Sequence, residues 1–521
     1  MVAVESLEAR SLMAAPPPAG LDFSFGGGAG FVGHPLAHNV ALSGVATQAD
    51  GKILVCGYTK PTEPQPVSLS LTPNRDFFLA RLNPDGTMDA SFGGGDGYVT
   101  AGPYGAADTV GWDDEAWGVA PMADGRIVVV GLGGVARFLP DGTLDTSLDP
   151  ANAPPGFARP EVHVFDWMGG PITNASTFLT DLRGVAPGPD GSAYLLGHIP
   201  GFFGALARMF PDGSLDADFV AQPLAPTPSP LFSHFAVGNP GDVGALTPLP
   251  GGGLLVAATR SWWDAASNRQ RVGMGLYAFD DGGKPLPGFG NAPRVSPETQ
   301  HGSWLGADGR AGSAADVDVA GDGRIVAAGA AGRAARRAAW VARFDANGVP
   351  DPTFGRKASA YVRAAAVTEA TDVEAGPDGK VTVALVTARN RRAAQENRNG
   401  YAVLRLNPDG SRDRTFGGRG RARGVLHLPF APSADAWPDA LGHFRDSPEK
   451  AVLAADPQGR LLVLAASNST LHVARLAEAP ALAAQRVTTS APAPAAVPAA
   501  QPAARDARDI LATADEETPV L

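Results

Sequence analysis

The sequence predicts an all-β protein: a seven-bladed β-propeller of four-stranded blades, closed by an N-terminal strand that completes the last blade. Three observations lead to this fold class. A unit of two apolar strands around a tight turn, followed by a second hairpin, recurs seven times. The last unit stops early, and a matching piece without a strand pair stands near the N-terminus. The hydrophobic content of 44%, with 65 Gly and 47 Pro, is typical of a globular chain dense in turns.

The first half of each unit is a pair of apolar strands around a glycine turn. Asp-Gly between two such runs is a strong hairpin signal, because glycine accepts the positive φ of a tight turn. The seven copies are SGVATQADGKILVCG (43–57), WGVAPMADGRIVVVG (117–131), RGVAPGPDGSAYLLG (183–197), GALTPLPGGGLLVAA (244–258), DVDVAGDGRIVAAG (316–329), DVEAGPDGKVTVAL (372–385) and VLAADPQGRLLVLAA (452–466).

The second half is an outer hairpin, as in FFLARLNPDGTMDASFGGGDG (77–97). We expect its third strand to end at the Pro-Asp-Gly turn and the fourth strand to begin with the Asp of the LD-x-x-F phrase. An Arg on the third strand and this Asp recur in six of seven units, so we interpret them as structural Arg–Asp pairs or turn locks. They are Arg81, Arg137, Arg208, Arg343, Arg405 and Arg475, with Asp22, Asp89, Asp145, Asp216, Asp351 and Asp413.

The ends of the chain predict how the array closes. The seventh unit reaches HVARL (472–476) and stops, while LDFSF (21–25) has no strand pair ahead of it. A strand borrowed across the termini is the closure of a β-propeller, and it removes the two open edges of a linear array. We therefore place the propeller at residues 20–476.

The repeated phrase GVA-x-x-x-DGKI-x-V-x-G, followed by ARLNPDGTLD-x-SFG, resembles the delta-60 repeat of bacterial exported proteins and is similar in layout to NHL-type propeller repeats. The resemblance covers residues 20–476 and implies a propeller, but no particular activity. The fourth unit departs from it, since Gly251 replaces the turn Asp, Ala278 the strand Arg and Pro287 the following Asp.

The flanking segments have a different character. Residues 1–19 form a leader in which VESLEARSLMAA (4–15) resembles the LEPR-XLL motif of exported planctomycete-type proteins, with Ala9 where the motif has proline. This resemblance implies a cell-surface location; the alternative is a short helical leader without an address. Residues 477–521 are Ala/Pro-rich, and we expect a disordered tail. The longest apolar runs are too short for a transmembrane segment.

Charge and cysteine content exclude several classes of function. The net charge of −11 argues against general nucleic-acid binding, which requires a basic surface. Cys56 is the only cysteine, which rules out an intramolecular disulfide and cysteine-rich metal sites.

The long insertions all fall between the second and third strands or between units, which places them as loops on one face of the disc. They are Tyr58–Arg75, Pro150–Thr180, Thr259–Val272, Asn291–Gly312 and Arg419–Pro448. Rigid scaffolds carry binding residues on such loops, so we expect a glycan or protein ligand at this face. Exposed aromatic residues would stack on sugars or grip a peptide; the alternative is that they fill small cores of the loops. The candidate ligand-binding residues are Trp112, Trp167, Trp262, Trp263, Trp304 and Trp437.

Acidic residues also recur nine positions before the turn Asp, where the innermost strands begin. A ring of carboxylates around the axial channel would attract Ca²⁺ or another divalent cation; the alternative is that each acid pairs with a neighbouring blade. The candidate metal ligands are Glu115, Asp181, Asp242, Glu369 and Glu449, with Ala41 and Ser313 at the other two positions.

No HExxH or GxSxG motif occurs in the sequence. The leading hypothesis is therefore a non-enzymatic binding or scaffolding propeller at the cell surface. The alternatives are a metal-dependent, lactonase-like hydrolase that uses the axial acids and a purely structural module of the envelope.

Overall fold

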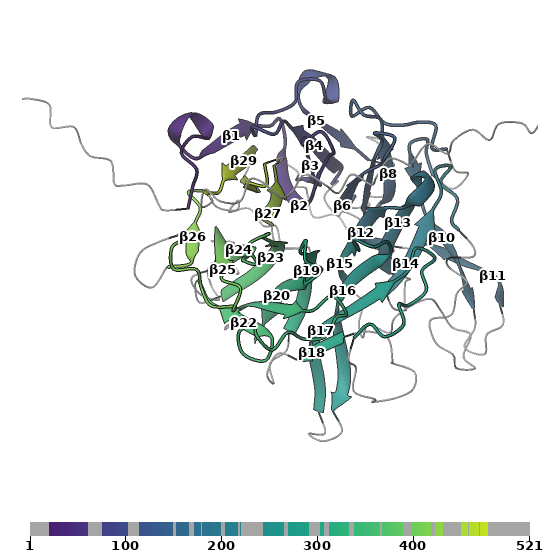
Figure 1. Ribbon diagram of the computed structural model, residues 1–521. Coiled ribbons are helices and arrows are strands. Elements are labelled where there is room, and N and C mark those ends of the chain that lie inside the picture. The colour runs from purple at the N-terminus through teal and green to yellow at the C-terminus, as the bar shows by residue number, and fades with distance from the viewer. Residues whose placement is uncertain are drawn as a thin grey trace, which may run out of the picture.

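The structure is a computed structural model in which seven β-sheets form a ring (Figure 1). It describes residues 20–60, 75–102, 114–149, 153–165, 171–178, 180–198, 204–216, 219, 243–264, 269–290, 303–306, 312–332, 338–364, 367–388, 399–417, 423–430, 450–456, 458–467 and 469–477. The all-β, seven-bladed propeller is confirmed. Six sheets have four strands each, and the sheet of blade 3 has three within the described residues.

Each blade is an antiparallel meander whose first strand lies next to the axis. Blades 1 to 3 consist, from the inside outward, of β2 (Asn39–Thr47), β3 (Ile53–Lys60), β4 (Phe77–Leu82) and β5 (Tyr98–Ala101); β6 (Ala116–Pro121), β7 (Ile127–Gly131), β8 (Gly134–Phe138) and β9 (Phe157–Ala158); and β12 (Thr180–Pro187), β13 (Ala193–His198) and β14 (Gly204–Met209). A separate hairpin, β10 (Glu161–Phe165) and β11 (Pro171–Phe178), lies between blades 2 and 3 in the chain.

Blades 4 to 7 continue the ring. They consist of β15 (Val243–Pro248), β16 (Leu254–Asp264), β17 (Arg269–Phe279) and β18 (Ser303–Gly306); β19 (Gly312–Val319), β20 (Ile325–Ala331), β21 (Ala338–Phe344) and β22 (Ser359–Val362); β23 (Val367–Ala375), β24 (Val381–Ala388), β25 (Asn399–Leu406) and β26 (Val425–His427); and β27 (Val452–Ala455), β28 (Leu461–Ser467), β29 (Thr470–Arg475) and β1 (Phe31–Pro35). Short 3-10 turns lie at η1 (Gly26–Gly28), η2 (Gly93–Gly95) and η4 (Pro189–Gly191).

The N-terminal strand closes the ring, as the sequence predicts. β1 pairs antiparallel with β29, from Phe31 opposite Ala474 to Pro35 opposite Thr470. The innermost strands of blades 1 and 7, β2 and β27, also contact each other. Seven apolar clusters of described residues each draw on two neighbouring blades, and the one with Val40, Ile53, Leu462 and Val473 joins blade 7 to blade 1.

The prediction that the fourth strand begins at the Asp of the LD-x-x-F phrase is wrong. In blade 1 this phrase makes one isolated bridge, Leu82 to Met88, and the strand itself starts only at Tyr98, after the glycines. Asp89 ends the bridge because its carboxylate accepts hydrogen bonds from Ser91, an Asx-type turn that bends the chain out of the sheet. The closing strand is displaced in the same way, from residues 21–25 to Phe31–Pro35.

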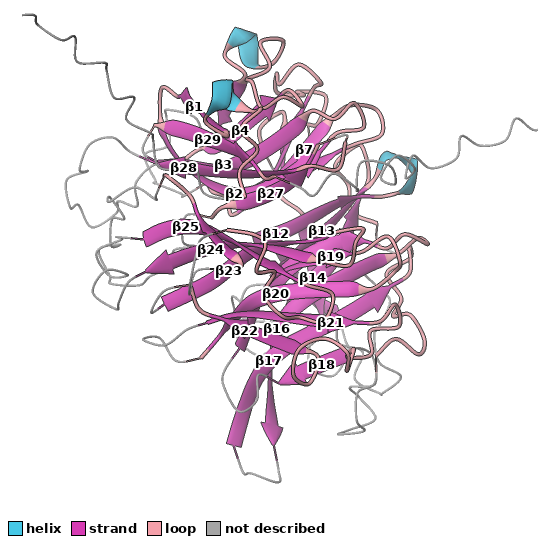
Figure 2. Cartoon of the chain, turned by 60° about the vertical axis from the view of Figure 1, so that its left-hand side comes forward, coloured by secondary structure: helices cyan, strands magenta, loops and turns pink. Residues whose placement is uncertain are grey.

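One expected loop is also a strand. The segment 259–272 continues β16 and β17 as a hairpin that protrudes from the body of the disc in both views (Figures 1 and 2). Among the described residues, we find no helix of the length and apolar character that crossing a membrane requires.

Candidate functional site

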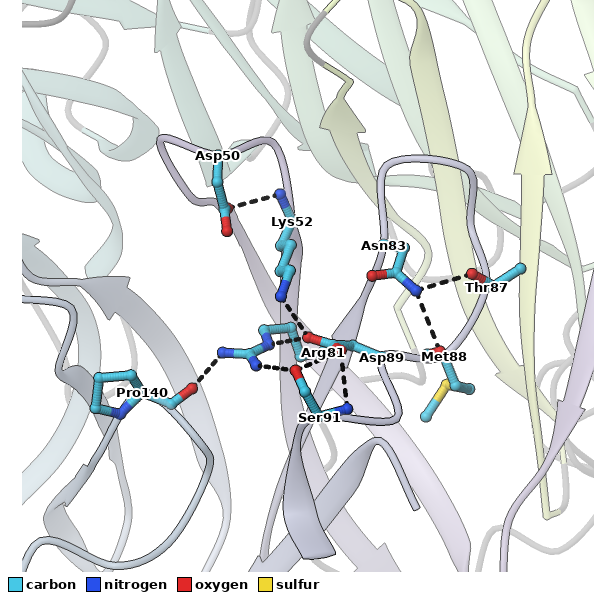
Figure 3. A network of polar contacts seen from close by, with 9 residues as sticks. All are labelled: Asp50, Lys52, Arg81, Asn83, Thr87, Met88, Asp89, Ser91 and Pro140. Carbon is cyan, nitrogen blue, oxygen red and sulfur yellow. Dashed lines mark hydrogen bonds and ion pairs between the residues drawn. The ribbon is translucent and has the colours of Figure 1, made fainter. Parts of the chain in front are cut away.

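The two faces of the disc differ in construction. We call the face with the turns between first and second strands and between third and fourth strands the constant face, and the opposite face the variable face. On the constant face of blade 1, Arg81 Nε donates to Asp89 Oδ2 at 2.6 Å, and Ser91 Oγ donates to Asp89 Oδ1 at 2.7 Å (Figure 3). Lys52 from the first turn reaches the same carboxylate at 2.9 Å. The two turns of a blade are therefore joined by charge-assisted contacts.

This Arg–Asp network recurs around the ring and confirms the structural interpretation of both residue sets. Arg81 also donates to the carbonyl oxygen of Pro140 in the next blade, and Arg137 donates likewise to Pro211, so the network links blades as well as strands. The described pairs are Arg81–Asp89, Arg137–Asp145, Arg208–Asp216, Arg343–Asp351, Arg405–Asp413 and, across the termini, Arg475–Asp22.

The protonation states agree with a structural role for these carboxylates. Burial opposes the ionisation of Asp89 and Asp413, but hydrogen bonds outweigh it and lower both pKa values below the ordinary range. Asp89 receives these bonds from Lys52 and Ser91. Asp413 receives them from Thr415 and Lys380. These acids stay charged at neutral pH and already have partners. The constant face therefore holds the ring together and leaves few of its repeated polar groups for a ligand.

The candidate tryptophans divide into two groups. Trp112, Trp167 and Trp437 lie outside the described residues. Trp262 and Trp263 lie in β16 and Trp304 in β18, so the expectation that these three occupy loops is wrong. Both strands belong to blade 4, which is the unit that departs most from the repeat.

The predicted ring of axial acids is described in part. Asp242 and Glu449 lie outside the described residues. Glu115 is buried, forms an ion pair with Arg75 and accepts a hydrogen bond from Trp117 Nε1 at 3.2 Å. Asp181 and Glu369 are half-buried, and Asp181 has a positive φ of 49° in the irregular part of β12. Within the described parts of the chain, no three His, Cys, Asp or Glu side chains form a group that could hold a metal ion. The pairing of Glu115 favours the structural alternative for that residue, while the metal site as a whole stays a prediction.

The innermost strands nevertheless carry acidic residues on one side of the ring. The outer strands β3, β4, β20 and β24 are buried along their described lengths, whereas β2 and β19 contain runs of half-buried residues. Two alternate positions of each inner strand, seven and five residues before the turn glycine, hold Gly, Ala, Thr or Val in five blades, but acids in blades 5 and 6. The small residues are Gly44, Ala46, Gly118, Ala120, Gly184, Ala186, Ala245, Thr247, Val452 and Ala454, and the acids are Asp316, Asp318, Asp372 and Glu374.

Three of these acids bind the backbone of the next blade. Asp316 Oδ2 accepts from the amide of Val373 at 2.9 Å, and Asp372 Oδ2 accepts from the amide of Leu453 at 2.8 Å. Asp318 Oδ2 does the same with Ala375 at 2.8 Å. Blades 5, 6 and 7 are thus cross-linked along the axis by side chains that the other blades lack.

Burial perturbs the ionisation of this group. Burial, followed by the charge of Asp316 and a hydrogen bond with it, raises the pKa of Asp372 well above its usual value. Burial, followed by the charge of Arg183, lowers the pKa of Lys450, against the attraction of Asp316 and Asp372. This cluster was not predicted from the sequence, although DVDV and DVEA place acids where the other units have small residues.

The family model described as "Domain of unknown function (DUF5122) beta-propeller" matches residues 70–92, 123–148, 320–354 and 376–416. These segments fall in blades 1, 2, 5 and 6 and support a propeller family. The comparison with curated proteins finds no match.

Several solved structures are similar at low identity. A protein of unknown function from Dyadobacter fermentans is 12% identical, with a TM-score of 0.38 over 89% of this chain and 100% of that one. Hydrazine synthase of Kuenenia stuttgartiensis is 9% identical, with a TM-score of 0.39 over 85% and 97%. PorZ, a surface component of the type-IX secretion system of Porphyromonas gingivalis, is 13% identical, with a TM-score of 0.34 over 82% of this chain and 46% of PorZ.

Proposed function

We propose that this chain is a non-enzymatic binding or scaffolding propeller of the cell surface, of the delta-60 repeat type, which contacts a glycan or protein ligand with its variable face. The observation that carries the proposal is the asymmetry of the two faces. The constant face repeats one Arg–Asp network in six of the seven blades. The elaborations that occur once, the β10–β11 hairpin and the extension of β16 and β17, both belong to variable-face connections. Ligand specificity requires unrepeated residues on a rigid support.

A screen of the full chain on a glycan array and a peptide array tests this proposal. A hit should be lost in the double variant Trp262→Ala, Trp263→Ala and kept in Arg324→Gln, which removes an exposed charge from the constant face. A hit that only the constant-face variant abolishes would contradict the proposal. Binding to neither array, with intact folding, favours the purely structural alternative.

The acids of the inner strands favour one second candidate, a metal-dependent hydrolase of lactonase type. Carboxylates suit Ca²⁺ and other hard divalent cations. Melting curves with Ca²⁺, Mn²⁺ and Zn²⁺ separate the two functions. A large upward shift with one metal, lost when Glu115, Asp181 and Asp242 are changed together to their amides, supports the hydrolase. Melting temperatures that none of the three metals changes would exclude the hydrolase.

A further inference from the structure

A bulge interrupts the innermost strand of six blades at the same point, eight residues before the turn glycine. Bulges are common next to functional sites, where they re-aim a side chain. The bulge residue of one blade contacts the next blade: the guanidinium of Arg183 lies over the ring of Trp117, 3.6 Å from its centroid, and Thr371 Oγ1 donates to the carbonyl oxygen of Ala451 at 2.7 Å. The bulge residues are Ser43, Trp117, Arg183, Gly244, Ala315 and Thr371.

Ser43, the bulge residue of blade 1, carries a hydroxyl that the chain does not satisfy. The residue is 6% exposed, and its Oγ has no hydrogen-bond partner among the described residues. Buried polar groups in folded proteins almost always have a partner, so an exception calls for an explanation. The hydroxyl therefore indicates a polar group from outside the chain at this position.

Lys450 lies beside this hydroxyl. Its amide nitrogen is 3.4 Å from the carbonyl oxygen of Leu42, the neighbour of Ser43 in β2. Its charge also acts on the thiol of Cys56 in β3. That thiol faces the same bulge, because a Cβ on Gly44 would lie 3.0 Å from its Sγ. The ammonium of Lys450 is therefore directed to the bulge of blade 1.

The side chains around Lys450 do not neutralise it. Burial, followed by the charge of Arg183, lowers the pKa of Lys450, although Asp316 and Asp372 attract its ammonium. These two acids are hydrogen-bonded to each other, and burial and Asp316 hold the pKa of Asp372 well above its usual value. A carboxyl pair of this kind shares a proton and carries one negative charge instead of two. Lys450 thus lacks a full counter-ion.

Arg183 is in a similar situation. Burial lowers its pKa, although the charges of Asp181 and Glu115 attract it, and Glu115 is already paired with Arg75. Arg183 and Lys450 are both half-buried, so part of each side chain is accessible to a small solute. An anion is the group that would relieve the repulsion between the two cations.

We propose that a small oxyanion, a carboxylate or a phosphate, binds near the axis of the ring and accepts hydrogen bonds from the Ser43 hydroxyl, the Arg183 guanidinium and the Lys450 ammonium. Charge-assisted hydrogen bonds are the strongest that such an anion can receive. The three donors belong to blades 1 and 3 and to the start of blade 7. This site goes beyond the proposed function, because it is separate from the glycan or protein ligand of the variable face.

Melting curves of the full chain in different salts test the inference. Sodium phosphate and sodium acetate present the two oxyanions, and sodium chloride at the same pH and ionic strength is the control. Phosphate, acetate or both should raise the melting temperature above its value in chloride, because an anion that binds only the folded state stabilises it. An effect of one oxyanion alone identifies the anionic group and also supports the inference.

Chemical labelling reports on the site directly. Acetic anhydride at pH 8, followed by mass spectrometry, gives the rate at which each lysine is acetylated. The oxyanion that raises the melting temperature should slow the labelling of Lys450 several-fold, because it covers the amine and favours its protonated form. The exposed Lys284 on the constant face is the internal reference, and its rate should not change.

Matched variants place the site. Lys450→Gln and Arg183→Gln should each weaken the oxyanion about tenfold or more, and Ser43→Ala should weaken it several-fold. Lys450→Arg keeps the charge and should keep the shift in melting temperature. Arg324→Gln, on the constant face, should respond as the wild type does. Each variant is compared with itself in chloride, which separates loss of the oxyanion from damage to the fold.

Two results would overturn the inference. The first is an equal melting temperature in phosphate, acetate and chloride, with an unchanged labelling rate of Lys450. The second is a shift that Lys450→Gln and Arg183→Gln both retain in full, which would show that the oxyanion binds elsewhere on the protein. Either result leaves the proposed ligand of the variable face standing, because the glycan and peptide arrays test that ligand separately.

Discussion

Asp22→Asn is expected to loosen the closure of the ring. Asp22 Oδ2 accepts from Arg475 Nε at 2.7 Å, across 453 residues of sequence. Asn keeps the Oδ1 acceptor that receives the amide and hydroxyl of Ser24, at 2.9 and 2.6 Å, but it removes the charge beside Arg475. The substitution therefore isolates the ion pair from the turn that surrounds it.

The expected cost follows from the burial of the pair. Leaving one partner of a buried ion pair alone costs about 3–5 kcal/mol, and an exposed pair contributes less than about 1 kcal/mol. The side chain of Arg475 is 8% exposed and that of Asp22 is 22% exposed. Between these limits we expect the free energy of unfolding in urea to fall by about 2 kcal/mol.

The matched control is Asp351→Asn. Asp351 Oδ2 accepts from Arg343 Nε at 2.8 Å, with 12% and 5% exposure, but the two residues belong to one blade. It should cost a similar free energy without opening the ring. Thermolysin digestion under native conditions, followed by mass spectrometry, distinguishes the two. Asp22→Asn should expose the segment 20–35 to cleavage near Phe25 and Phe31, and Asp351→Asn should not. Equal protection of this segment in both variants would refute the reasoning that the terminal pair holds the closure.

Three further predictions concern the interior of the disc. Burial and Asp316 of the adjacent blade raise the pKa of Asp372, so the protonated carboxyl stabilises the fold at acid pH and this contribution is lost as the pH rises through the raised pKa. The urea midpoint should therefore fall as the pH rises, and Asp372→Asn should flatten this fall. An unchanged pH profile in Asp372→Asn would contradict the prediction. Gly57→Ala should lower the free energy of unfolding in urea by about 3 kcal/mol, since a Cβ there would lie 1.9 Å from the carbonyl oxygen of Ala41. In its control, Gly321→Ala, the added Cβ would meet nothing within 4 Å, so the free energy of unfolding should stay unchanged. Burial raises the pKa of Cys56 to about 12, so a thiol reagent should label it only in denaturant, and rapid labelling of the native protein would show that the thiol is accessible.

The local sequence pattern predicted the architecture of this chain correctly but misplaced its strand boundaries. The Asp-Gly turns and the unpaired N-terminal phrase predicted seven blades and their closure, because both depend on contacts that every unit repeats. The fourth strands were misplaced because Asp89 followed by Ser91 forms a turn that stops the bridge, and the glycines after it reverse the chain before pairing resumes at Tyr98.

For the candidate site, the sequence showed the residues but not their contacts. Glu115 was identifiable as an acid at an inner strand, but its ion pair with Arg75 crosses a variable connection and leaves no mark in sequence spacing. Asp316 and Asp372 were visible as departures from the repeat, yet only the structure shows that each reaches the backbone of the following blade. The extension of β16 and β17 into the segment 259–272 escaped prediction because its polar composition resembles that of a loop.

The bond between Asp22 and Arg475 also cannot form until late in synthesis, because its two partners lie far apart in the sequence. A ribosome adds about 5–20 residues per second, so about 20–90 s separate the appearance of these two residues, given their distance of 453 positions. During that time β1 has no partner, and the last blade does not yet exist to receive it. An apolar strand that waits unpaired is a target for wrong partners. The nascent chain therefore has a period of vulnerability that ends only when nearly all of the disc has been made.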